Sequence, residues 1–299
     1  MKLHKTYTYV IIVFISLLGS VSAQKNVSGP LHVQEQSAFN FIIIGDRTGA
    51  GPDSWKTLGR SISETNRISP DFVLFIGDLI DGYDMPGMAV DKQWEKFGTY
   101  ADKLSIPYVC VPGNHDIYDD HSYAAWKKNR GETYFSFTYR GCGFIVLNTE
   151  ETLDRFQGGL GSRQITFLKQ KLAEFSGKKH LFILMHRPVW VSRGQLKREW
   201  QQIKPLLGSV PFTMIAGHMH ALGQKTDSEN NKYIIVGPTG GKTRLARNPA
   251  LALFQHYTLF TVKPDSIHIA YIEPGRVYDQ SLAESAYNRY KATLFMYQK

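Results

Sequence analysis

Six side chains of types that bind divalent metals follow short apolar runs at five places in the chain. They are two carboxylates, one amide and three imidazoles: Asp46, Asp78, Asn114, His186, His218 and His220. Oxygen and nitrogen ligands of this kind suit Mn, Fe, Zn or Mg, and they select none of these. His218 and His220 are two residues apart, so both would face the same side of an extended segment. Each could then serve one of two adjacent cations, and the set predicts a centre of two divalent metal ions.

The apolar runs before these residues predict the strands that position them: Phe39–Ile44, Phe72–Ile76, Tyr108–Val111, Leu181–Met185 and Phe212–Ala216. Continuous apolar runs are typical of strands that are covered on both faces. Helical spacing over Trp55–Ile68 and Trp94–Leu104 separates the first three runs. This alternation predicts parallel strands joined by crossover helices, with the polar side chains at the carboxyl ends of the strands.

The second half of the chain predicts a second sheet with a larger share of antiparallel strands. A hairpin is expected around Arg140-Gly141, where Thr133–Tyr139 and Cys142–Asn148 alternate. Further helices are expected over Ser162–Phe175, with Ser162 as the cap, over Gln195–Leu207 and near Ser281–Tyr290. Mostly antiparallel strands are expected at Leu222–Thr226, Tyr233–Val236, Tyr257–Val262 and Ser266–Tyr271. We therefore expect an α/β fold of two face-to-face sheets with helices outside, in a single domain over residues 39–299.

The first residues have the pattern of a secretory signal peptide. Lys2 and Lys5 precede the apolar stretch Val10–Leu18, and the small residues Val21-Ser22-Ala23 predict cleavage after Ala23. Residues 1–23 are thus expected to be the signal peptide and residues 24–38 an irregular lead-in. The mature protein would be secreted or periplasmic, with no stable membrane span, because the apolar stretch is short for one. An uncleaved N-terminal anchor is the alternative.

The overall charge favours anionic ligands without naming one. The chain has 299 residues and a formal net charge of +9, which attracts anions over a long range. Its basic clusters, at residues 127–130 and 178–179, are short, so no dedicated nucleic-acid surface is predicted. The two cysteines, Cys110 and Cys142, each lie in or beside an apolar strand. Export would permit a disulfide between them, and two buried free thiols are an equal expectation.

The ordered set of motifs resembles that of the calcineurin-like metallophosphoesterases, a family that includes the purple acid phosphatases. The resemblance runs from about Phe39 to Ile272 and rests on Gly45-Asp46, Gly77-Asp78, Gly113-Asn114-His115-Asp116, Met185-His186-Arg187-Pro188 and Gly217-His218-Met219-His220. It implies a four-layer α/β/β/α sandwich with a two-metal centre. In that centre Asp46 and His220 would bind the first metal and Asp78 would bridge both. The second metal would take Asn114, His186 and His218, and His115 would face the scissile phosphate.

One position departs from the family pattern. The first motif of the family is commonly Asp-x-His, whereas this chain has Asp46-Arg47-Thr48, and Thr48 is a poor metal ligand. Asp81, three residues after Asp78, is a candidate substitute ligand. The purple acid phosphatases carry a tyrosine at that position, so a ferric purple centre is not expected here.

Three residues beside the expected metals are candidates for catalysis: His115, Asp116 and Arg47. His115 would stabilise charge on the phosphoryl group or protonate the leaving alkoxide. Asp116 would orient the His115 ring or, alternatively, cap the turn. The guanidinium fork of Arg47 suits bidentate contact with phosphate, and the alternative is an ion pair at the surface or behind the ligands. Arg187 is a second candidate for phosphate contact, with the same alternative.

The leading hypothesis is an exported, metal-dependent phosphoesterase that hydrolyses a phosphate monoester or diester with a metal-bridged hydroxide. Its substrate would be a phosphorylated small molecule or a phosphoprotein. The alternative is a catalytically weak binding protein on the same fold that holds phosphorylated or glycan ligands. The intact set of ligand types favours the enzyme, because a decayed site would have lost more than the extra histidine of the family.

Overall fold

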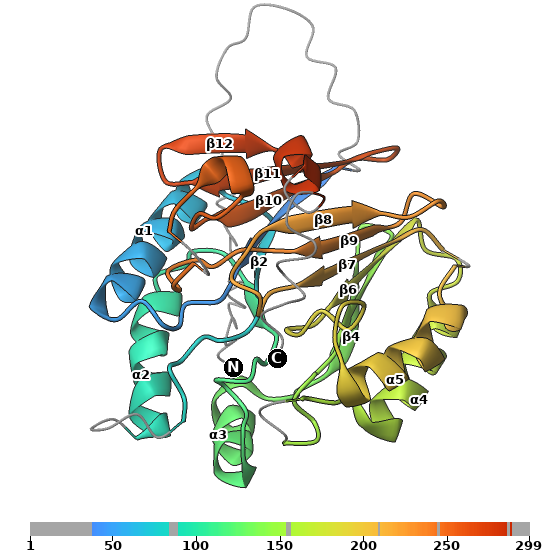
Figure 1. The fold of residues 1–299 in the computed structure, drawn as a ribbon, viewed down its shortest axis with the longest axis horizontal. Helices are drawn as coiled ribbons and strands as arrows, with labels where there is room; N and C mark the ends of the chain where they lie inside the picture. The colour runs from blue at the N-terminus through green and yellow to red at the C-terminus, as the bar shows by residue number, and fades with distance from the viewer. Residues whose placement is uncertain are drawn as a thin grey trace, which may run out of the picture. The chain divides into compact units, whose positions relative to one another are not determined.

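The structure is a computed structural model that describes residues 38–83, 89–153, 157–208, 210–243, 246–285 and 288. Two mixed sheets form its centre (Figure 1). The first sheet contains β1 (Phe39–Ile44), β2 (Phe72–Phe75), β3 (Tyr108–Cys110), β10 (Tyr257–Val262), β11 (Ile267–Glu273) and β12 (Arg276–Asp279). Its strand order is β12-β11-β10-β1-β2-β3, and β1, β2 and β3 are parallel as the sequence predicts.

The second sheet contains β4 (Phe135–Tyr139), β5 (Cys142–Val146), β6 (His180–Leu184), β7 (Phe212–Ala216), β8 (Gly223–Thr226) and β9 (Lys232–Ile235). Its strand order is β4-β5-β6-β7-β9-β8. The expected hairpin around Arg140-Gly141 is confirmed by the antiparallel pairing of β4 with β5. The strands β5, β6, β7 and β9 are parallel to one another, so their carboxyl ends lie at one edge.

Three apolar clusters hold four layers together. The cluster between the sheets is rich in phenylalanine, and the Phe41 ring stacks on Phe260 at 4.6 Å and on Phe72 at 5.4 Å. A second cluster joins the outer face of the first sheet to α1 (Pro52–Ile68), α2 (Val90–Ala101) and α3 (Asp120–Arg130). A third joins the outer face of the second sheet to α4 (Gly161–Glu174) and α5 (Gly194–Ile203). The short 3-10 helices are η1 (Lys204–Leu206) and η2 (Pro249–Leu251). The expected α/β/β/α sandwich is confirmed.

The mostly antiparallel pairing expected for the later strands is confirmed, with one exception. The exception is the strand expected at Tyr233–Val236, which is β9: it pairs antiparallel with the edge strand β8 and in parallel with β7. The helix α3 lies within Tyr118–Arg130, a segment for which no helix is predicted from the sequence. Its start is fixed by a capping box between Asp119 and Ser122, where serine stands in place of the Glu or Gln that usually marks this motif.

The start of α4 also differs from expectation, because Ser162 is not its cap. The helix begins at Gly161, and the Leu160 and Gly161 N–H groups donate to the Glu199 carboxylate of α5 at 2.8 and 3.1 Å. A buried anion from a neighbouring helix thus satisfies the first donors of α4 and complements the positive end of its dipole. This contact joins α4 to α5 across more than thirty residues of sequence.

Several expectations fall wholly or partly outside the described residues. These are the signal peptide over residues 1–23, nearly all of the lead-in over residues 24–38, and the last part of the helix expected at Ser281–Tyr290. Residues 281–285 are helical. Among the residues described, none of the helices is both long and apolar enough to span a bilayer. Cys110 and Cys142 are both free and buried, and they belong to different sheets.

Candidate metal centre

The loops after five parallel strands meet where the two sheets come together at their carboxyl ends. Backbone hydrogen bonds tie these loops to one another: Asp46 N–H donates to the Gly77 carbonyl, and Gly217 N–H donates to the His186 carbonyl, both at 3.0 Å. The first bond joins the loops after β1 and β2, and the second joins those after β6 and β7. The backbone thereby fixes the positions from which the polar side chains project.

The six expected ligands include two groups whose donor atoms converge. Asp78, His186 and His218 each offer an atom within 4.8 Å of the others, and so do Asp46, Asp78 and His220. Asp78 belongs to both groups, so its two carboxylate oxygens can serve adjacent cations. This arrangement agrees with the bridging role that the family resemblance implies for Asp78.

Four of the candidate ligands have an unusual backbone conformation that sets the direction of their side chains. Asp46, Asp78, His218 and His220 all have φ between 50° and 68°, a left-handed region that non-glycine residues seldom adopt. Strain of this kind persists where the surrounding structure imposes it, and it gathers at functional sites. The flanking glycines leave the necessary room, since a Cβ atom on Gly217 would lie 2.3 Å from Asp46 Oδ2. The glycine that precedes His218 is therefore required by the close approach of the Asp46 carboxylate.

Backbone carbonyls orient the imidazole rings. Nδ1 of His186 lies 2.9 Å from the Ile76 carbonyl, and Nδ1 of His220 lies 2.5 Å from the Lys242 carbonyl. A carbonyl only accepts, so each Nδ1 carries a proton, and Nε2 is the nitrogen that would bind a cation. Nε2 of His186 lies 3.2 Å from Asp78 Oδ1, and Nε2 of His220 lies 3.5 Å from Asp46 Oδ1. Hydrogen bonding from the far nitrogen is typical of metal-binding histidines.

Asn114 supplies the observation that tests whether the site fits a metal. Its amide nitrogen donates to the Tyr83 hydroxyl at 2.8 Å. Its amide oxygen is buried and has no hydrogen-bond partner in the described part of the chain. A buried carbonyl oxygen without a partner costs free energy, and a cation would satisfy it. The residues present therefore fit a divalent metal centre.

The charges of the site also call for cations. Burial opposes ionisation of Asp78, but the imidazoles of His186 and His115 outweigh it and hold the pKa of Asp78 well below its usual range. Burial lowers the pKa of His186, yet the Asp78 and Asp46 carboxylates more than offset this and raise it to about 10. A proton on His186 thus compensates the carboxylate charge, a role that divalent cations would take over.

His115 lies beside these groups without joining either of them. Its backbone N–H donates to Asp78 Oδ1 at 3.0 Å, and its Nδ1 lies 2.6 Å from the Asp81 carbonyl. Its Nε2 is 4.0 Å from Asp78 Oδ2, and the side chain is 29% exposed. The ring therefore has one nitrogen anchored to the protein and the other close to the Asp78 carboxylate.

Asp116 does not orient the His115 ring, because Nδ1 of that ring donates to the Asp81 carbonyl instead. The buried Asp116 carboxylate accepts from the N–H groups of Gly113, Leu79 and Ile80 at 2.9, 2.8 and 3.2 Å. Burial and the nearby Asp78 charge raise the pKa of Asp116 to about 7. Its geometry is that of a turn cap that joins the loops after β2 and β3.

Arg47 and Asp81 bind each other. The Arg47 guanidinium is buried, with Nη2 3.0 Å from Asp81 Oδ1, Nε donating to the Leu79 carbonyl and Nη1 donating to Ser54 Oγ. It also lies 3.9 Å from the centre of the Trp55 ring. These contacts match the alternative for Arg47, an ion pair behind the ligands. Asp81, the candidate substitute ligand, belongs to neither ligand group in the described residues.

Two residues near the site were missed by sequence reasoning. Glu150 is buried, and both of its carboxylate oxygens accept from Arg187 Nε, at 2.9 and 3.0 Å. The Thr149 hydroxyl accepts from the Arg187 backbone N–H at 3.1 Å. Both follow the end of β5, which is parallel to β6. The expectation that polar residues just after parallel strands lie at one edge of the sheet therefore applies to them too. Neither of them follows a glycine, whereas Asp46, Asp78, Asn114 and His218 each do.

Comparison with known proteins assigns the family. The sequence matches the calcineurin-like phosphoesterase family over residues 39–222. It is 23% identical over 239 residues to the probable glycerophosphodiester phosphodiesterase GpdQ of Arcobacter nitrofigilis, covering 73% of this chain and 80% of that protein. It is 28% identical over 195 residues to the serine/threonine-protein phosphatase CPPED1 of Mus musculus, covering 58% of this chain and 61% of that protein.

Solved structures show the same fold. A dimetal phosphatase from Danio rerio superposes with a TM-score of 0.64 at 17% identity, covering 78% of this chain and 95% of that one. GAP50, the anchor in the inner membrane complex of Plasmodium, superposes with a TM-score of 0.59 at 14% identity, covering 81% of this chain and 88% of that one. With the family match spanning more than half of the sequence and the ligand groups in place, the chain belongs to the calcineurin-like phosphoesterase family.

Proposed function

We propose that this phosphoesterase hydrolyses a phosphate monoester or diester where the carboxyl ends of β1, β2, β3, β6 and β7 meet. The observation that carries the proposal is the position of Asp78, whose carboxylate belongs to both groups of ligand atoms. Calcineurin-like phosphoesterases use a dinuclear divalent metal centre. Bound cations would supply the acidity that activates water and the positive charge that neutralises phosphoryl oxygens. The residues that would hold them are Asp46, Asp78, Asn114, His186, His218 and His220.

His115 is the proposed proton donor. Its Nδ1–H is committed to the Asp81 carbonyl, so a second proton on the ring must reside on Nε2. That nitrogen faces the carboxylate shared by the two ligand groups, 4.0 Å from Asp78 Oδ2. A phosphate held there would place its leaving oxygen within reach of Nε2. His115 would then donate its proton as the bond from phosphorus to the leaving oxygen breaks.

Arg187 would favour the anionic substrate by its charge. Burial and then the Arg187 cation depress the pKa of His218 well below its usual range, so the guanidinium acts at close range on the group formed by Asp78, His186 and His218. Glu150 holds Nε of Arg187 and so fixes the orientation of the guanidinium plane. Positive charge held in place before substrate arrives lowers the cost of binding a phosphate.

The substrate is proposed to be a phosphorylated small molecule or a phosphoprotein. The relatives named above point to these two classes, since one is named as a probable phosphodiesterase of glycerophosphodiesters and the other as a protein phosphatase. Monoesters and diesters differ in phosphate charge. Both would be hydrolysed at the same candidate metal centre. The two ester classes are therefore to be separated by assay.

The deciding experiment compares p-nitrophenyl phosphate with bis-p-nitrophenyl phosphate in the presence of added Mn²⁺. We expect turnover of at least one ester, its loss on chelation, and its recovery when metal is restored. The alternative function, a weakly catalytic protein that holds phosphorylated or glycan ligands, predicts metal binding without metal-dependent turnover of either ester. That second pattern would overturn the enzymatic proposal.

We also propose that the protein is exported. The support is the order of Lys2 and Lys5, the apolar stretch Val10–Leu18 and the small residues before Gln24. N-terminal sequencing of protein recovered from the medium or periplasm of expressing cells tests this. We expect a chain that starts at Gln24. An intact chain that keeps Met1 and stays in the cytoplasm would contradict export.

A further inference from the structure

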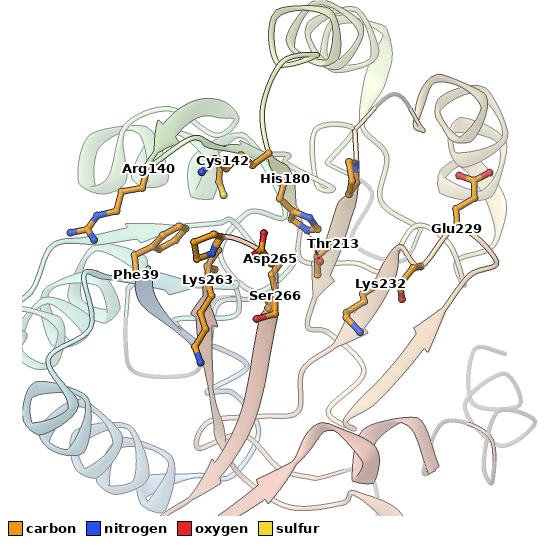
Figure 2. Close-up of a pocket in the computed structure, with 16 residues that line it drawn as sticks. Phe39, Arg140, Cys142, His180, Thr213, Glu229, Lys232, Lys263, Asp265 and Ser266 are labelled. Atoms are coloured by element: carbon orange, nitrogen blue, oxygen red, sulfur yellow. Dashed lines mark hydrogen bonds between the residues drawn. The ribbon is translucent and has the colours of Figure 1, made fainter. Parts of the chain in front are cut away.

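A cavity lies at the amino ends of the strands in the second sheet. It has a volume of about 320 Å³, and Figure 2 shows His180, Thr213 and Lys232 pointing into it from neighbouring strands. His180 begins β6, whereas His186 follows the end of the same strand. The four steps from His180 to Leu184 alone span about 13 Å. The cavity and the candidate metal centre are therefore separate sites at opposite ends of β6.

His180 supplies a hydrogen-bonding group on the side of this cavity that the second sheet forms. Cys142 and His180 are register partners on β5 and β6, and Phe39 and Val262 line the opposite wall. His180 Nε2 lies 2.9 Å from the Thr213 hydroxyl. No group of the described residues forms a hydrogen bond with His180 Nδ1, which lies on a side chain that lines the cavity. A hydroxyl can donate as well as accept, so Thr213 permits the tautomer in which Nδ1–H points to a ligand.

The rim of the cavity carries more positive than negative charge. Lys179, Lys232, Lys263 and Arg140 line it, against Asp265 and Glu229. Arg140 is already engaged, since its guanidinium donates to the Ala38 carbonyl and lies 3.4 Å from Asp71 Oδ1. Among the described residues, no ion pair joins Lys179, Lys232 or Lys263 to either acid of the rim. Burial, and then the Lys232 cation, lower the pKa of His180 to about 4, so a neutral imidazole lies in a field of positive charge.

We propose that this cavity binds a small organic oxyanion, with the charged head near Lys232 and His180 Nδ1 and an apolar body against Phe39 and Val262. Small-molecule sites combine apolar walls with a few placed polar groups, and about 300 Å³ is the lower end of their usual volume. The site is independent of the phosphoesterase centre. It takes its ligand by charge and shape and needs no metal ion.

The test uses phenylphosphonate with metal-free protein, because its phosphorus–carbon bond is not a phosphate ester. The His180 ring signals are followed by NMR through a titration, with the neutral benzyl alcohol and the planar carboxylate benzoate as parallel probes. We expect saturable shifts of His180 with phenylphosphonate, a rise in the His180 pKa on binding, and none of this with benzyl alcohol. Saturation with benzoate would show that any small oxyanion suffices, and its absence would restrict the ligand to tetrahedral anions.

Two substitutions of lysine localise the binding. Lys232→Gln removes a cation that lines the cavity, and Lys225→Gln removes one on β8 that lies over the Tyr233 ring instead. We expect binding about fivefold weaker in Lys232→Gln, as for loss of a partly exposed ion pair, and unchanged in Lys225→Gln. The proposal is overturned by unshifted His180 signals at saturating millimolar probe. It is also overturned by equal affinities in the two variants or by benzyl alcohol binding as tightly as the anion.

Discussion

The amide nitrogen of Asn114 donates a hydrogen bond to the Tyr83 hydroxyl at 2.8 Å. This contact identifies which end of the amide is the nitrogen, so the oxygen points away from Tyr83. The oxygen is buried and has no hydrogen-bond partner in the described chain. Tyr83 has a left-handed φ of 49°, and its ring lies edge-on to His115 at 4.6 Å. Burial raises the pKa of Tyr83 to about 12, so the phenol stays protonated at neutral pH. Tyr83 is thus a positioning residue for Asn114.

Tyr83→Phe should weaken binding of the metal that Asn114 is proposed to hold. The substitution keeps the ring against His115 and removes only the hydroxyl that fixes the amide. Loss of a group that orients a ligand typically lowers metal affinity about 10- to 100-fold. Calorimetric titration of the chelated protein with Mn²⁺ measures this directly.

The matched control is Tyr257→Phe, which removes a tyrosine hydroxyl that donates to Glu64 of α1 at 3.1 Å. We expect its metal affinity to equal that of the unsubstituted protein. Equal affinities in the Tyr83 and Tyr257 variants would mean that the amide of Asn114 needs no support from Tyr83.

Asp78→Asn and His115→Ala should separate metal binding from proton transfer. Asp78 belongs to both ligand groups, so its amide variant should lose metal at one or both positions. His115 belongs to neither, so His115→Ala should keep its metal and lose turnover by roughly 10²- to 10⁴-fold. Metal content by mass spectrometry and ester hydrolysis report the two effects. Equal metal loss in both variants would remove the distinction between the two residues.

Glu150→Gln should destabilise the protein strongly because it leaves Arg187 buried without its carboxylate. The side chains of both residues are almost fully buried, and breaking a buried pair from one side typically costs about 3–5 kcal/mol. Urea unfolding of the metal-free protein gives the free energy of unfolding. The control is Glu132→Gln, whose exposed pair with Lys127 should contribute little to the free energy of unfolding.

The double variant Glu150→Gln with Arg187→Met adds a check on the cause. If the unpaired charge is what destabilises the single variant, removing the guanidinium should restore part of the lost stability. A double variant less stable than Glu150→Gln would show that packing of Arg187, rather than its charge, matters most.

The placement of the ligands was predictable from the sequence because each depends on a local rule. An apolar run indicates a strand, parallel strands share a carboxyl edge, and a polar residue just after each strand must lie there. Asp46, Asp78 and His218 follow this rule at the ends of β1, β2 and β7. Their placement does not depend on a specific contact between side chains distant in the sequence.

The partners of Arg47, Asp81 and Asp116 were not predictable in this way. Each has its partners on a neighbouring loop: Asp116 holds the N–H groups of Leu79 and Ile80, and Arg47 binds Asp81. Which donor meets which acceptor depends on how the loops after β1, β2 and β3 pack against one another. The same reason applies to α4, whose cap is Glu199 of α5 rather than a residue of its own sequence neighbourhood.

His256 should make the stability of the metal-free protein depend on pH between about 4 and 6.5. The ring is buried: its Nε2 accepts from the Gly237 N–H at 3.2 Å, and its Nδ1 lies 3.2 Å from the Phe254 carbonyl. Protonation of Nε2 would break the first of these bonds. Burial lowers the pKa of His256 from 6.5 to about 4, so in this window the unfolded chain binds a proton that the folded chain does not.

Stability from His256 is therefore complete above pH 6.5 and falls as the pH drops towards 4, by up to about 1.4 kcal/mol per pH unit. His256→Gln keeps an acceptor for Gly237 and removes the titration, so its unfolding free energy should fall less steeply over this range. Urea unfolding in the presence of a chelator measures both slopes. Parallel slopes for the His256 variant and the unsubstituted protein would show that the folded chain protonates this buried ring as readily as the unfolded chain does.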